Sequence, residues 1–128
     1  MWQTFLTKWK RQAPDGGMPT LQHHVFHACA CVTMGVFFAG LTVLINLLGP
    51  QLPPVVIGAW AATVAYLAIE GGSILWAKED PLNSLHDVVQ AMTFLWPLYW
   101  LLFGNVLNFG LLLVFFLAVY FIILYYKP

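Results

Sequence analysis

The sequence predicts an all-α fold, a polytopic membrane helical bundle of about four transmembrane helices with an N-terminal interfacial amphipathic helix. Of the 128 residues, 61% are hydrophobic and only 8% are charged, and the mean hydropathy is +0.80. Soluble domains carry about 25% charged residues, so this composition excludes an ordinary soluble fold. Four apolar runs of about 20 residues, the length that crosses a bilayer as a helix, use most of the chain. We therefore expect a single integral membrane domain over residues 1–128.

The predicted interfacial helix covers residues 1–12, where apolar and basic residues separate onto two sides at helical spacing. The apolar side holds Trp2, Phe5, Leu6 and Trp9, and the basic side holds Lys8, Lys10 and Arg11. Such a helix lies in the headgroup layer. The prolines and glycines of residues 13–19 then stop it.

The first predicted membrane helix covers residues 23–48 and ends at Gly49-Pro50. At about 100° per residue, small and polar side chains fall on one broad face of this helix. They are His24, His27, Cys31, Gly35, Ala39, Thr42 and Asn46. A line of small and polar residues is typical of a helix-packing surface in lipid, so we expect this face to point inward.

The second predicted helix covers residues 54–77 and has two distinct sides. A small-residue stripe for close helix approach holds Gly58, Ala61, Ala62, Ala65, Ala68 and Gly72, and the other side holds Thr63, Tyr66, Glu70 and Ser73. An unpaired carboxylate at membrane depth costs several kcal/mol, so a neighbouring helix is expected to satisfy Glu70.

The third and fourth predicted helices cover residues 81–103 and 109–126. Asp80 is expected to cap the third helix, with Pro81 in its first position. One face of this helix carries Asp80, Asn83, Ser84, Asp87 and Gln90. Its apolar part, residues 88–103, is short for a full crossing, which leaves a tilted, kinked or re-entrant segment open. The almost wholly apolar last helix is expected to be the most lipid-exposed.

The placement of basic residues predicts the orientation. Lys8, Lys10, Arg11, Lys78 and Lys127 all fall on one side of a four-helix arrangement, and the opposite connections carry no Lys or Arg. Cytoplasmic loops carry the excess of Lys and Arg, so both termini are predicted to be cytoplasmic. The start of helix one, the end of helix two and the start of helix three then share one leaflet.

This arrangement brings rare titratable residues to similar depth. Four of the five acidic residues lie between positions 70 and 87. The candidate catalytic residues are His27, Glu70 and Asp87, supported by His24, Cys31, Ser73, Asp80, Ser84 and Gln90. Glu70 and Asp87 are suited to general acid and base roles, with His27 as a third titrating group. An equally open alternative makes Glu70 a structural link between helices, bonded to His27 or Ser84.

A metal site is a weaker candidate. His27 and Cys31 lie four residues apart, so both side chains can approach a metal ion from one helical face. Histidines at the edge of a membrane helix more often lie in the interface or pair with a carboxylate, and His86 is expected to be interfacial. The sequence names no cofactor.

Three short stretches carry a family resemblance: His24-Val-Phe-His27, Ala68-Ile-Glu70 and Asn83-Ser-Leu-His-Asp87. A histidine early in the first helix, an acidic residue late in an inner helix and an Asp in the following helix start resemble the VanZ-like group of small bacterial membrane proteins, including YfiM-like relatives. The resemblance covers roughly residues 23–105. It implies a bacterial inner-membrane protein, in one branch linked to glycopeptide resistance, and implies no particular substrate.

Three functional hypotheses follow. The first is a polar site at the cytoplasmic leaflet that binds or processes a lipid headgroup or lipid-linked precursor. The second is a non-catalytic homo-oligomer or part of a larger complex, such as a phage holin or a small subunit of a membrane assembly. The third is an ion or proton pathway through Glu70, Asp87 and Asn105. The formal net charge of zero suggests no nucleic-acid partner.

Overall fold

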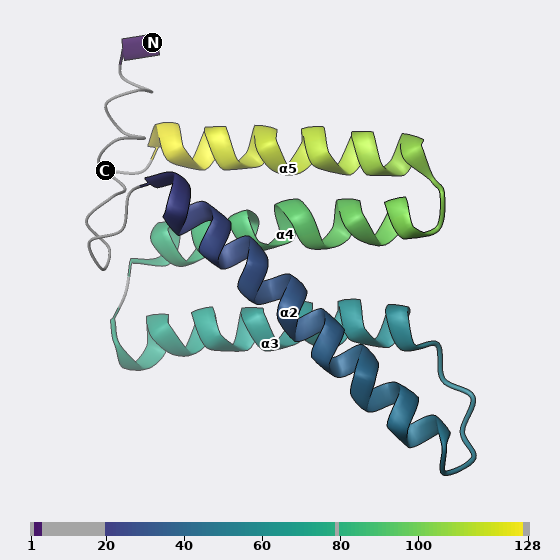
Figure 1. Cartoon of the computed structure of the whole chain (residues 1–128). Helices are drawn as coiled ribbons and strands as arrows, with labels where there is room; N and C mark the ends of the chain where they lie inside the picture. Colours follow the sequence, from purple (N-terminus) through teal and green to yellow (C-terminus); the bar gives the residue numbers. More distant parts are fainter. Residues whose placement is uncertain (1, 4–19, 79, 127–128) are drawn as a thin grey trace.

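The computed structural model describes residues 2–3, 20–78 and 80–126, and this part of the chain folds into four long helices (Figure 1). They are α2 (Thr20–Asn46), α3 (Pro54–Trp76), α4 (Pro81–Leu102) and α5 (Val106–Tyr126). The all-helical prediction is therefore confirmed. Apart from Trp2 and Gln3, the predicted interfacial helix over residues 1–12 lies outside the described residues.

Three of the described helices are long and apolar enough to cross a membrane, namely α2 from His24 onward, α3 and α5. Helix α4 is not among them, although its 22 residues rise about 33 Å at 1.5 Å per residue. That length exceeds the hydrocarbon core of about 30 Å. What sets α4 apart is therefore the polar composition of its first half, and not its length.

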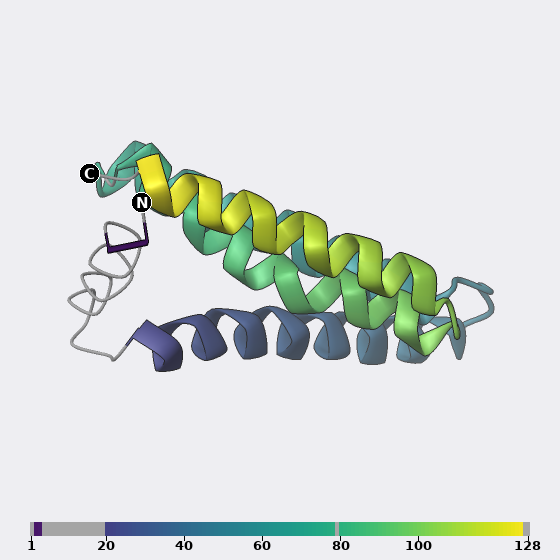
Figure 2. The same ribbon diagram turned by 90° about the horizontal axis from the view of Figure 1, so that it is seen from above.

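The helices form two layers. Helices α3, α4 and α5 lie side by side, with α4 in the middle, and α2 crosses the face of this layer obliquely (Figures 1 and 2). Consecutive helices run in opposite directions, so one end of the bundle holds the start of α2, the α3–α4 turn and the end of α5. We call this end the α3–α4 end. Helix α4 packs against all three others, and α2 packs mainly against α3 and α4.

The central position of α4 explains its composition. Its neighbours bury five polar side chains, Ser84, His86, Asp87, Gln90 and Thr93, whereas its outward positions include exposed apolar residues such as Leu85 and Phe94. Helices α2, α3 and α5 expose large apolar side chains over most of their outer surfaces. In a membrane that surface faces hydrocarbon, so polar groups are tolerated only inside the bundle.

Small residues allow α2 and α3 to approach closely. A Cβ atom added at Gly58 of α3 would lie 2.5 Å from the carbonyl oxygen of Gly35 and 2.9 Å from the Cβ of Ala39, both on α2. The predicted inward face of α2 and part of the small-residue stripe of α3 thus meet here. Close backbone approach of this kind supplies the van der Waals packing that holds membrane helices together.

Two asparagines stabilise the α2–α3 and α4–α5 connections by hydrogen bonds. The side chain of Asn46 accepts a hydrogen bond from the Leu52 amide at 2.9 Å and donates one to the Leu52 carbonyl at 2.8 Å. The Asn105 Oδ1 accepts a hydrogen bond from the Asn108 amide at 3.0 Å, which caps α5. Because of this cap, α5 begins at Val106 and not at residue 109 as predicted.

The start of α4 differs in one respect from the prediction. Asp80 occupies the N-cap position with Pro81 after it, but the Asp80 side chain makes no capping hydrogen bond. The extended backbone at Asp80 and the fixed φ of the following proline are sufficient to begin the helix here.

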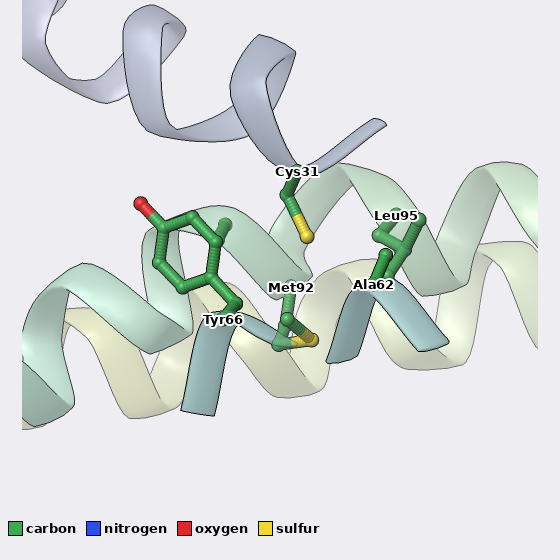
Figure 3. Close-up of a cluster of buried hydrophobic side chains, with 6 residues drawn as sticks. Cys31, Ala62, Tyr66, Met92 and Leu95 are labelled. Carbon is green, nitrogen blue, oxygen red and sulfur yellow. The ribbon is translucent and has the colours of Figure 1, made fainter. Parts of the chain in front are cut away.

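A buried cluster joins α2, α3 and α4 near the middle of the bundle. It consists of Cys31, Ala62, Tyr66, Ala91, Met92 and Leu95. Figure 3 shows the Cys31 thiol pointing into this cluster and the Tyr66 hydroxyl pointing away from it. The ring of Tyr66 therefore belongs to the apolar core, and its hydroxyl leads to the polar residues described next.

Candidate functional site

His27 of α2 connects three helices at the α3–α4 end. Its Nδ1 is hydrogen-bonded to the Tyr66 hydroxyl of α3, and its Nε2 lies 3.5 Å from Oδ1 of Asp87 on α4. All three residues are buried. The imidazole thus lies between a hydroxyl and a carboxyl group, where it can exchange a proton with either. We call His27, Tyr66, Asp87 and the neighbouring Glu70 the His27 centre.

Glu70 lies one helical turn beyond Tyr66 on α3 and is 8% exposed. Residues four apart share a helical face, so Glu70 and Tyr66 are neighbours on the side that faces α2 and α4. The structure therefore buries His27, Glu70 and Asp87 at the same end of the bundle. It brings His27 and Asp87 into direct contact.

A second polar cluster lies beside the first and joins α2, α4 and α5. The Tyr120 hydroxyl is hydrogen-bonded to Nε2 of His24. The His86 ring stacks on Tyr120 with ring centroids 4.5 Å apart, and Gln90 Nε2 donates a hydrogen bond to His86 Nδ1 at 3.3 Å. We call His24, His86, Gln90 and Tyr120 the His86 cluster.

His86 is 1% exposed, so its side chain faces the interior of the bundle. The reason is that Tyr120 of α5 covers the face of α4 that carries His86. As expected, α5 is the least buried of the three apolar helices, although Tyr120, Ile123 and Leu124 are buried.

The supporting residues lie in several different places, and Cys31 belongs to the apolar cluster. His24 and Gln90 join the His86 cluster, and Ser84 is buried on α4. The Ser73 hydroxyl donates to the Ile69 carbonyl of its own helix at 3.2 Å, and Asp80 is exposed at the start of α4. Neither Ser73 nor Asp80 is placed in the His27 centre, because both lie toward the exposed turn between α3 and α4.

Sequence reasoning missed the two tyrosines that hold the histidines. Tyr66 was grouped with Glu70 on one face of α3, and their spacing of four residues was the available signal. Tyr120 is the first polar side chain of α5 after Asn108. A polar group deep in an otherwise apolar helix needs a partner inside the protein, and this requirement could have identified Tyr120 as a functional candidate.

The two residues of the candidate metal pair, His27 and Cys31, have different surroundings in the structure. The two ring nitrogens of His27 face Tyr66 and Asp87, and Cys31 packs in the apolar cluster. The described residues hold no group of three or more His, Cys, Asp or Glu side chains suited to a metal ion.

An open groove of about 1150 Å³ lies next to the His86 cluster, between α4, α5 and the start of α2. Most of its lining is aromatic or aliphatic. The lining residues are Trp2, His24, Gln90, Thr93, Phe94, Leu117, Tyr120, Phe121, Ile122, Tyr125 and Tyr126. His24, Gln90 and Tyr120 belong to both the cluster and the groove, so the groove gives access to the second cluster and not to the closed His27 centre.

The charges of the site limit what it can bind. Two carboxyl groups, Glu70 and Asp87, are buried in the His27 centre. The one Lys or Arg within the described residues, Lys78, is exposed in the α3–α4 turn. Such a site favours ligand groups that donate hydrogen bonds, such as hydroxyl or ammonium groups, over a bare phosphate, which carboxylates repel.

The fold and its three apolar helices define a small helical membrane protein with a polar interior at one end. Comparison of the chain with protein-family models, curated proteins and solved structures finds no match. The resemblance to VanZ-like proteins stays a prediction.

Proposed function

We propose that this protein binds the polar headgroup of a membrane lipid or lipid-linked precursor at the α3–α4 end, near the cytoplasmic leaflet of a bacterial inner membrane. The main observation in support of this proposal is that His27 is buried between Tyr66 and Asp87, which come from two other helices. Ionisable residues within membrane helices are costly and usually functional. A single interhelical hydrogen bond would serve packing, whereas among the described side chains this end of the bundle holds two buried carboxyl groups and the imidazoles of His24, His27 and His86.

The acceptor-rich chemistry of the site supports a headgroup with donors. Asp87 and Glu70 accept hydrogen bonds when ionised, and histidine and tyrosine both donate and accept. Phosphatidylethanolamine presents an ammonium group, whereas phosphatidic acid with the same acyl chains presents only its phosphate. We therefore expect the protein to prefer phosphatidylethanolamine over phosphatidic acid.

The test measures retained lipid on the purified full chain by native mass spectrometry. Wild type is expected to retain phosphatidylethanolamine at least ten times better than phosphatidic acid. His27→Gln, Glu70→Gln and Asp87→Asn should lose this preference while circular dichroism shows an intact helical fold. Thr33→Val changes an exposed polar residue of α2 and should keep the preference.

Two results would count against the proposal. Variants that fail to fold would make the three residues structural. A wild-type protein without any headgroup preference that forms large detergent-stable oligomers would favour the non-catalytic oligomer.

A further inference from the structure

The groove beside the His86 cluster has the dimensions of a lipid tail in one leaflet. Along α5 its lining extends from Leu117 to Tyr126, nine residue steps that rise about 13.5 Å. One leaflet contributes about 15 Å, half of the hydrocarbon thickness of about 30 Å. The volume of about 1150 Å³ exceeds the roughly 300–1,000 Å³ of pockets for drug-sized ligands.

The two ends of the groove differ as the two ends of a lipid do. Tyr125 and Tyr126 stand at the end of α5, where tyrosines commonly mark the membrane interface, whereas His24 is bonded to Tyr120 farther along the groove. At the other end, Phe94 and Leu117 form an apolar wall. The described part of the lining contains no Lys, Arg, Asp or Glu, which suits a hydrocarbon chain.

We propose that this groove holds one fatty-acyl chain of a membrane glycerophospholipid. The headgroup end lies toward Tyr125 and Tyr126, and the tail lies against Phe94, Leu117 and Phe121. This inference rests on the proposed function and deepens it, because the tyrosine pair that ends the groove and the His27 centre lie at the same α3–α4 end of the bundle.

The experiment fills the groove without touching the His27 centre. Leu117→Trp adds bulk at a lining position, whereas Leu111→Trp makes the same change at a position 60% exposed on α5 that does not line the groove. The full chain is incubated with 1-palmitoyl-2-oleoyl phosphatidylethanolamine in detergent, and native mass spectrometry counts the lipids retained per chain. Wild type and Leu111→Trp should retain one lipid, and Leu117→Trp should bind it at least ten times more weakly.

Several outcomes would overturn the assignment. They are a wild-type chain that retains no lipid, equal retention by the two tryptophan variants, and tighter binding of free palmitate than of the phospholipid. If Leu117→Trp does not fold, Phe94→Trp fills the opposite wall and decides the question.

The Asp87→Asn variant separates this inference from the proposed function. Retention of lipid by Asp87→Asn without the headgroup preference supports both the groove and the headgroup site. If Leu117→Trp keeps both the headgroup preference and the wild-type affinity for phospholipid, the acyl-chain proposal is refuted and the headgroup proposal stands.

Discussion

At the scale of single residues, His27 determines how the polar end is held together. Its imidazole contacts a hydroxyl of α3 and a carboxyl group of α4. An interhelical hydrogen bond in a membrane protein contributes on average about 0.6 kcal/mol. A buried carboxylate that loses its partner costs about 3–5 kcal/mol. The second effect is larger, so the loss of His27 acts mainly through Asp87.

We therefore expect His27→Ala to lower the free energy of unfolding, by less than the about 3–5 kcal/mol that a fully unpaired buried carboxylate costs, because Asp87 has a further interaction. Adding Asp87→Asn to that variant should recover part of the loss, because the amide carries no charge that needs a partner. A double-mutant cycle measured by unfolding in detergent checks this prediction. Strictly additive effects of the two substitutions would show that the two side chains do not interact.

Substitution of Ser84, in contrast to that of His27, is not expected to lower the stability of the protein. It is buried on α4, and its hydroxyl has no hydrogen-bond partner among the described residues. Removing a buried polar group without a partner relieves a desolvation cost of about 1–3 kcal/mol. Ser84→Ala should therefore leave the free energy of unfolding unchanged or raise it.

Thr63→Val is the matched comparison for Ser84→Ala. The Thr63 hydroxyl accepts a hydrogen bond from the Trp96 indole at 3.1 Å, so its loss should lower the free energy of unfolding by about 1 kcal/mol. Thermal unfolding of both variants in the same detergent provides the measurement. A clear loss of stability in Ser84→Ala would mean that its hydroxyl does have a partner.

At the scale of helices, the crossing of α2 and α3 depends on the absence of a side chain at Gly58. Gly58→Ala would place a methyl group 2.5 Å from a backbone oxygen of Gly35, so the helices must separate. Overpacking of this kind costs about 1–3 kcal/mol. Gly71→Ala on the same helix meets no atom within 4 Å and should be tolerated. Unfolding midpoints of the two variants should differ accordingly, and equal midpoints would contradict the close crossing.

The helices also show what the sequence could and could not predict. Long apolar runs and the small or polar face of α2 were recognisable because helical spacing places such residues on one side. The burial of His86 was not, because an angular count describes one helix and does not reveal how many neighbours surround it. The pairs His27–Tyr66 and His24–Tyr120 join residues 39 and 96 positions apart, and no local pattern specifies such distant contacts.

At the scale of the whole molecule, α4 lies between α3 and α5 with α2 across one face. Surrounded in this way, a helix can carry Asp87, His86 and Gln90 because their partners are protein groups and not lipid. The same helices that shield α4 must present apolar surface outward, and their exposed residues do so. Polarity inside and apolar surface outside are thus two consequences of one arrangement.

This arrangement predicts the number of membrane crossings. If α4 crosses the bilayer with its neighbours, the chain crosses four times and both ends lie on one side. If only the three most apolar helices cross, the two ends lie on opposite sides. The rise of about 33 Å along α4 and its position within the layer of α3 and α5 favour four crossings.

We therefore expect both ends to be cytoplasmic. With four crossings, the two chain ends and the α3–α4 turn lie on the same side of the membrane, and these segments carry all of the Lys and Arg residues, namely Lys8, Lys10, Arg11, Lys78 and Lys127. Reporters that are active on only one side of the membrane, fused in turn to each end of the full chain, measure this directly. Cytoplasmic signals from both fusions are the expected result. Signals from opposite sides would mean that α4 does not cross the membrane. The contact between Asp87 and His27 would then belong to a bundle with a different membrane topology.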